Sequence, residues 1–142
     1  MDKIPSFQKN HDVLPVGLHA QTDGNRITTF DLRMKKPNGG NYISPKALHT
    51  IEHLLATVLR NSREKENIVY FGPMGCRTGF YLLTVNLSYA QALALLKESI
   101  PQALALDEIP GAKREECGNY LEHDLQDAKK ELQAYLAVLE KL

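Results

Sequence analysis

Two histidines and a glutamate near the middle of the chain have the spacing of a metal site on a helix. The stretch His49-Thr50-Ile51-Glu52-His53 reads H-x-x-E-H. Residues four apart on an α-helix lie on one face, so His49 and His53 can bind one metal ion through two imidazoles. Glu52 lies at the flank of that face, where its carboxylate can act as a base beside the metal. The alternative is a half-buried helix whose histidines are only packed and hydrogen-bonded.

The residues around this motif predict the helix that carries it. Ser44 can cap the helix and Pro45 suits its first position, so we expect it to run from about Pro45 to Arg60. An apolar stripe predicts that one side of this helix is buried, with the histidines lying beside the stripe. The stripe consists of Leu48, Ile51, Leu55 and Leu59.

A catalytic zinc-type site has three protein ligands and one open position, so a third ligand is needed. The candidates are Cys76, Cys117, a distant carboxylate and His123. Two imidazoles with one thiolate suit Zn²⁺ or Fe²⁺. Cys76 lies in the glycine-rich stretch 72–79, which exposes it next to Arg77, and a nearby cation or metal favours the reactive thiolate. Spacing alone does not distinguish which cysteine binds the metal.

Length and charge narrow the class of protein. The chain has 142 residues, which suits one domain with a hydrophobic core. Its 17 Lys and Arg balance 17 Asp and Glu. The chain therefore lacks the excess of basic residues that would indicate nucleic acid or an anionic membrane as its main partner. No apolar run approaches the roughly 20 residues that span a bilayer, and residues 1–20 fit neither a secretory signal nor a transit peptide. We therefore expect a cytoplasmic protein with reduced cysteines.

The remaining elements are short strands followed by helices. Strands are expected at 14–20, 26–33, 68–71 and 80–86, and a turn at 22–25 makes the first two an antiparallel pair. Residues 1–12 look irregular. Ser88 can cap a helix over 89–99 that Pro101 ends or kinks, and a last helix runs from Tyr120 or Asp124 to Leu139. This order predicts a single α+β domain, with a mostly antiparallel sheet and helices packed on it.

Three motifs together resemble the S-ribosylhomocysteine lyase family (LuxS, the autoinducer-2 synthesis family). They are residues 49–56 (HTIEHLLA), 73–80 (PMGCRTGF) and 116–120 (ECGNY). They are long and in the right order, and the resemblance extends from Ser6 to the last helix. One stretch departs from the family pattern, because residues 70–73 read YFGP where many members have Asp-x-Ser-Pro, an acidic position near the substrate.

The resemblance implies a lyase-like metalloenzyme domain that spans residues 1–142. The residues that match the family's functional positions are His49, His53 and Cys117 as metal ligands, Glu52 and Cys76 as general acid/base residues, and Ser6, His11 and Arg33 in the substrate pocket. The resemblance also implies one divalent metal per subunit, Fe²⁺ that Zn²⁺ can replace. It further implies a homodimer with active sites at the subunit interface.

The implied reaction moves the carbonyl of S-ribosylhomocysteine from carbon 1 to carbon 3 of the ribose. The ketone at carbon 3 makes the carbon 4 proton acidic, so homocysteine can be eliminated and 4,5-dihydroxy-2,3-pentanedione, the precursor of autoinducer-2, remains. Each step moves protons and develops negative charge on oxygen, which acid/base groups and a Lewis-acidic metal serve.

Two other readings explain part of the pattern. An H-x-x-E-H metalloprotease needs the histidines and Glu52 but not Cys76. A non-catalytic, metal-stabilised binding protein needs His49, His53 and Cys117 but neither acid/base residue. A closed metal site with four protein ligands favours this second reading.

Overall fold

A four-stranded antiparallel sheet forms the centre of the computed structural model, which describes residues 1–22 and 26–142. The strands are β1 (Gly17–Thr22), β2 (Ile27–Arg33), β3 (Ile68–Pro73) and β4 (Gly79–Val85). Their order is β1-β2-β4-β3, so β2 and β4 pair along the middle of the sheet and join the two halves of the chain. The expected pairing of the first two strands is confirmed, while residues 23–25 of the expected turn lie outside the described residues.

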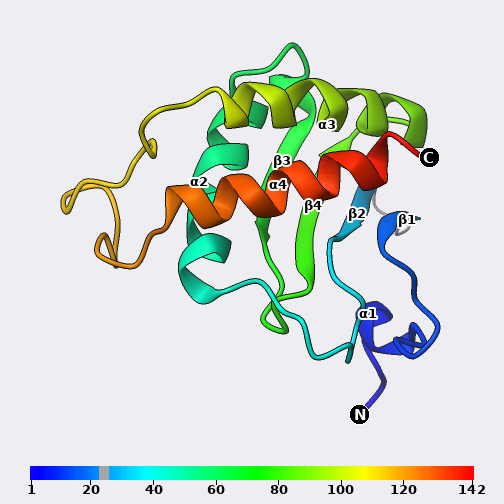
Figure 1. The fold of residues 1–142 in the computed structure, drawn as a ribbon. Helices are drawn as coiled ribbons and strands as arrows, with labels where there is room; N and C mark the ends of the chain where they lie inside the picture. Colours follow the sequence, from blue (N-terminus) through cyan, green and yellow to red (C-terminus); the bar gives the residue numbers. More distant parts are fainter. Residues whose placement is uncertain (23–25) are drawn as a thin grey trace.

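Three long helices pack against one another and over the sheet (Figure 1). They are α2 (Pro45–Arg60), α3 (Tyr89–Leu104) and α4 (Leu125–Leu139), and a short 3-10 turn η1 (Lys65–Asn67) precedes β3. Side chains alternate between the faces of a strand, so Phe80, Leu82 and Thr84 of β4 are buried while the residues between them are half-buried. The expected α+β domain, with an antiparallel sheet and helices packed on it, is confirmed.

The N-terminal segment lies against part of the sheet. It contains the short helix α1 (Pro5–Gln8), where residues 1–12 were expected to be irregular. Pro5 occupies the first helical position, but none of the four residues is buried, so the turn leaves no apolar pattern in the sequence. Lys9 Nζ lies 3.1 Å from Asp31 Oδ2 on β2 and ties the segment to the sheet.

The end of α3 differs from the expectation, and the start of α4 decides between the two expected starts of the last helix. α3 continues to Leu104 with Pro101 inside it, past the end expected at Ser99, because Ile100 and Ala103 are buried in the core. The last helix begins at the later of the two expected starts, since the Asp124 side chain accepts the Asp127 amide and caps it. The first strand likewise begins later than expected, at Gly17.

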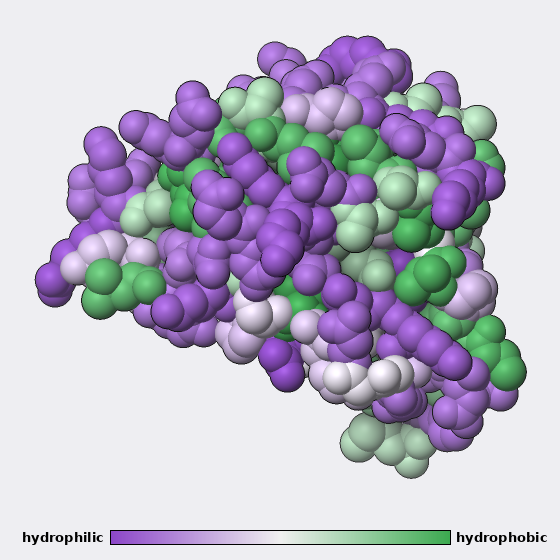
Figure 2. Space-filling model, viewed as in Figure 1, coloured by the Kyte–Doolittle hydropathy of each residue, from purple (hydrophilic) through white to green (hydrophobic). Residues whose placement is uncertain are grey.

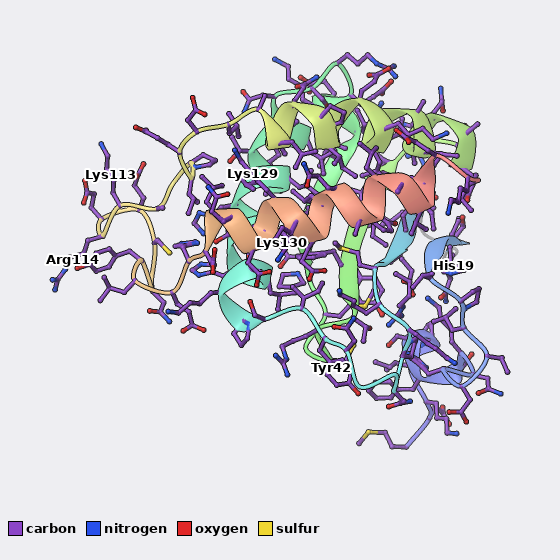
Figure 3. The ribbon with its side chains drawn as sticks, viewed as in Figure 1. His19, Tyr42, Lys113, Arg114, Lys129 and Lys130 are labelled. Atoms are coloured by element: carbon purple, nitrogen blue, oxygen red, sulfur yellow. The ribbon has the colours of Figure 1, made fainter. Side chains whose placement is uncertain are left out.

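The surface over α4 is mostly hydrophilic (Figure 2), and Lys129 and Lys130 project from this helix (Figure 3). Apolar side chains appear in the same view over the loop that precedes α4 and over the segment between α1 and β1. Within the described ranges, no helix has the length and apolar character to cross a membrane.

Candidate active site

The helix that carries the H-x-x-E-H motif begins as the sequence predicts. The Ser44 hydroxyl accepts the Ala47 amide at 3.2 Å, Pro45 follows it, and the helix runs to Arg60. The Ser44 hydroxyl also donates to Asp127 Oδ2 at 2.8 Å, which joins the starts of α2 and α4. The apolar side of α2 lies in the core, so His49, Glu52 and His53 are half-buried at its edge.

Four side chains meet beside α2 as a candidate metal centre. They are His49, His53, Cys117 and His123, and their ligating atoms all lie within 4.8 Å of one another. The Cys117 sulfur is 3.4 Å from His49 Nε2, 3.8 Å from His53 Nε2 and 3.7 Å from His123 Nε2. A tetrahedral centre with metal–nitrogen bonds of about 2.1 Å and metal–sulfur bonds of about 2.3 Å separates these atoms by about 3.6 Å. The group can therefore hold a metal ion.

The second nitrogen of each imidazole ring is held by the protein. The bonds run from His49 Nδ1 to Glu122 O (2.8 Å), from His53 Nδ1 to Pro110 O (2.8 Å) and between His123 Nδ1 and Thr50 Oγ1 (2.9 Å). A carbonyl can only accept, so His49 and His53 donate from Nδ1 and keep the lone pair on Nε2 for a metal. Such outer bonds also fix the orientation of the rings.

His123 was one of the open candidates for the third ligand, and the structure places it with Cys117 rather than instead of it. Burial, followed by the neighbouring rings of His49 and His53, lowers the pKa of His123 to about 4. The ring is therefore neutral at pH 7, the form that can bind a metal. The buried Thr50 hydroxyl bonds both His123 and the Asp124 amide, which fixes this part of the chain against α2.

Cys76 lines a different part of the molecule, together with the predicted substrate-binding residues. A hollow of about 370 Å³ is lined by Cys76, Ser6, His11 and Arg33, and also by Phe7, Pro73, Met74, Gly75 and Tyr81. The Cys76 thiol is exposed, as its glycine-rich surroundings predict. The structure thus brings four of the predicted residues to one hollow, between the N-terminal segment and the turn that joins β3 to β4.

A buried ion pair forms the back of this hollow. Arg33 donates to both carboxylate oxygens of Asp31, at 2.7 and 3.1 Å, and to the Thr78 hydroxyl at 2.7 Å. Asp31 and Arg33 are 0% and 1% exposed, although alternation along β2 places them on the face away from the helices. Burial and the charge of Asp31 raise the pKa of Tyr81, which lies opposite Asp31 on β4.

The two candidate groups line separate hollows of the chain. Cys117 lines one with Arg114 and residues 118–121 of the loop before α4, whereas Cys76 lines two others. Figure 3 shows Lys113 and Arg114 on this loop, which extends to the left, away from the sheet and from the N-terminal segment. The resemblance implies active sites that draw on both chains of a homodimer, so the two cysteines of one site need not come from the same chain.

Comparisons with known proteins extend over almost the whole chain. The family model described as S-Ribosylhomocysteinase (LuxS) matches residues 4–141. The S-ribosylhomocysteine lyase of Borreliella afzelii is 45% identical over 149 residues, covering 100% of this chain and 95% of the relative. The lyase of Phocaeicola vulgatus is 45% identical, covering 96% of this chain and 89% of the relative. The lyase of Finegoldia magna is 42% identical, covering 100% and 94%.

Proposed function

Because this chain belongs to the LuxS family, we propose that it is an S-ribosylhomocysteine lyase that releases homocysteine and the precursor of autoinducer-2. The family match confirms the expected family and, with it, the class of enzyme. The observation that carries the proposal is that one chain contains both features that such a reaction needs. They are a side-chain cluster able to hold a metal and a hollow lined by an exposed thiol. We take residues 1–142 as one metalloenzyme domain.

His49, His53 and Cys117 are the proposed metal ligands, with one divalent ion per subunit. Imidazole and thiolate donors suit Fe²⁺, which we propose as the native ion, and Zn²⁺ as its substitute. The ion supplies Lewis-acid stabilisation of negative charge on the sugar oxygens. His123 lies beside these ligands as the fourth member of the cluster.

Cys76 and Glu52 are the proposed proton-transfer groups. Cys76 lines the same hollow as Ser6, His11 and Arg33, where the sugar would bind, so its sulfur can remove and return protons on the ribose carbons during carbonyl migration. Glu52 lies on α2 beside His53, and its half-buried carboxylate serves the elimination step. Arg33 contributes by closing the back of the hollow, because its guanidinium is already bonded to Asp31 and Thr78.

A homodimer with the active sites at the interface would unite the two groups. Cys76 and Cys117 line separate hollows of one chain, so a complete site requires a second copy that brings the metal cluster of one subunit to the thiol of its partner. The exposed apolar side chains support such an association, since several lie in the N-terminal segment and in the loop before α4: Ile4, Phe7, Val13, Tyr120 and Leu121. Both cysteines are free, which suits a reducing, cytoplasmic location.

The test is release of a thiol from S-ribosylhomocysteine. The purified protein, kept anaerobic with Fe²⁺, is given the substrate, and free homocysteine is followed with a thiol-reactive dye. We expect steady release in the unmodified protein and none in Cys76→Ser, which should keep its fold and its metal. Retained turnover in Cys76→Ser would remove the thiol from the mechanism.

One observation favours the non-catalytic, metal-stabilised reading: four side chains, rather than three, surround the metal position. If His123 binds the ion permanently, no coordination position is left for substrate. A folded, metal-loaded dimer that releases no homocysteine would then support this reading. The presence of Cys76 in a hollow with Ser6, His11 and Arg33 argues against it, because a purely structural metal site has no use for them.

A further inference from the structure

The turn that carries Cys76 is held by the protein on both sides. The Met74 amide donates to Gly79 O at 2.9 Å and the Arg77 amide to Met74 O at 3.0 Å, which closes the turn. Arg77 has a φ of 61°, the left-handed conformation that reverses the chain directly after the cysteine. Thr78 then points inward and is 2% exposed, while the Cys76 thiol stays exposed. The two side chains are therefore brought together by the turn itself.

The hydrogen bonds of the Thr78 hydroxyl define its direction. Arg33 Nη1 lies 2.7 Å from Thr78 Oγ1, and a guanidinium can only donate, so the hydroxyl oxygen accepts this bond. The hydroxyl has one hydrogen left, and the Cys76 sulfur lies 3.1 Å away. The other partners of Arg33 are the two oxygens of Asp31, which lock the guanidinium toward Thr78. An ionised sulfur can only accept a hydrogen bond, so with Cys76 as the thiolate the chain of hydrogen bonds runs from Arg33 through Thr78 to the sulfur.

This direction matters for the chemistry of the thiol. A hydrogen bond to an ionised acceptor is about twice as strong as one to a neutral acceptor, so a hydroxyl that donates to sulfur favours the thiolate over the thiol. Arg33 strengthens the effect, because a donor that itself accepts a charged hydrogen bond is polarised, and Asp31, Arg33 and Thr78 are all removed from water. The other titratable or charged groups around the thiol are Arg77 beside it, His11, Tyr42 and Tyr81 in the two hollows, and Lys9 and Asp31 behind Arg33.

We propose that Thr78 is a positioning residue for Cys76: its hydroxyl relays the hydrogen bond of Arg33 to the sulfur, stabilises the thiolate and directs it into the hollow. The inference rests on the proposed function only in taking Cys76 as the group that moves protons. This role explains why Arg33 lines the substrate hollow although its three side-chain hydrogen bonds all go to Asp31 and Thr78. Arg33 acts on the thiol through Thr78 rather than by direct contact.

The test compares Thr78→Val, which keeps the shape but lacks the hydroxyl, with Thr78→Ser, which keeps the hydroxyl. The rate of Cys76 alkylation by iodoacetamide is measured between pH 5 and 9, and peptide mass spectrometry separates Cys76 from Cys117. The thiolate is the reacting form, so we expect alkylation at pH 7 to slow about threefold to tenfold in Thr78→Val and its pH curve to move to higher pH. Thr78→Ser should restore the rate.

Turnover provides the second readout. The kcat for homocysteine release should fall in Thr78→Val with little change in KM, and recover in Thr78→Ser. Thr78→Val leaves Arg33 Nη1 without its partner in a buried place, so circular dichroism and metal content are checked first. If this variant does not fold, Thr78→Ala, which leaves room for a water molecule, is measured instead.

Alkylation curves that coincide in the unmodified protein and in Thr78→Val, or a Thr78→Ser variant as slow as Thr78→Val, would overturn the relay. This failure is distinct from failure of the proposed function. The alkylation experiment needs no substrate, so a normal curve in Thr78→Val with full lyase turnover removes only the role of Thr78. A shifted curve in a protein that releases no homocysteine keeps the relay and removes the lyase.

Discussion

The buried pair of Asp31 and Arg33 makes a sharp prediction about stability. Asp31 accepts two hydrogen bonds from Arg33 and a third from Lys9, and it is fully buried. Asp31→Asn keeps the shape of the side chain but removes its charge, and its amide group presents hydrogens to donors. Arg33 then remains as a buried cation without a counter-charge, and the N-terminal segment loses its anchor on β2.

The size of the effect follows from this burial. Removing one partner of a buried ion pair costs about 3–5 kcal/mol, because the remaining charge is not solvated. Proteins of this size unfold with a free energy of about 5–15 kcal/mol, so Asp31→Asn should fold but be much weakened. With a urea dependence of about 2 kcal/mol per molar, the midpoint of unfolding should fall by about 1.5–2.5 M.

Urea denaturation followed by circular dichroism measures this shift. Glu98→Gln is the matched control, because Glu98 pairs with Arg63 at 3.1 Å but both side chains are more than half exposed, at 53% and 55%. We expect its midpoint to stay almost unchanged, since exposed pairs contribute little. Adding Arg33→Met to Asp31→Asn removes the unpaired buried charge, so the urea midpoint of the double variant should rise part of the way back. Equal shifts in Asp31→Asn and Glu98→Gln would refute the argument from burial.

Three further predictions concern the site. His53→Ala should bind much less metal, measured by elemental analysis, with its secondary structure retained; full metal content would exclude His53 as a ligand. Glu52→Gln should keep both fold and metal yet lose homocysteine release, and unchanged turnover would exclude the carboxylate from catalysis. Lys9→Met should raise KM for S-ribosylhomocysteine severalfold with a smaller change in kcat, because the residues of the N-terminal segment lose their tie to the sheet; an unchanged KM would show that the tie is not needed for binding.

The local parts of the site were predictable from the sequence, because their geometry depends on a single helix. The cap at Ser44 and the spacing of His49 and His53 fix two imidazoles on one edge of α2, as the periodicity predicts. Cys117 and His123 reach this edge only because the loop before α4 folds back on α2. Two of its bonds to α2 come from the backbone carbonyls of Pro110 and Glu122, and two more join the Thr50 hydroxyl to His123 and to the Asp124 amide. The loop's fold leaves no trace in the spacing of the sequence, so spacing alone could not show whether Cys76 or Cys117 joins the two histidines.

Tertiary packing explains the points where sequence reasoning failed. A proline usually ends a helix, but Ile100 and Ala103 on either side of Pro101 gain more by burial in the core than the helix loses at one missing amide. Asp31 and Arg33 lie on the face of β2 away from the helices, yet they are buried because they bond each other and Lys9 of the N-terminal segment bonds Asp31.

The register of β2 with β4 connects this buried pair to the reactive thiol. Gly79 lies directly opposite Arg33, and a side chain at Gly79 would collide with the backbone carbonyl of Leu32. Only glycine therefore allows the two strands to approach this closely at the end of the sheet, where Thr78 precedes β4. That approach places the Thr78 hydroxyl 2.7 Å from Arg33, and the turn before it places Cys76 within 3.1 Å of Thr78. The glycines of the Cys76 motif thus have two roles. They leave the Cys76 thiol exposed, and Gly79 allows the close approach of β2 and β4 that brings Arg33 to Thr78, the hydrogen-bond partner of the thiol.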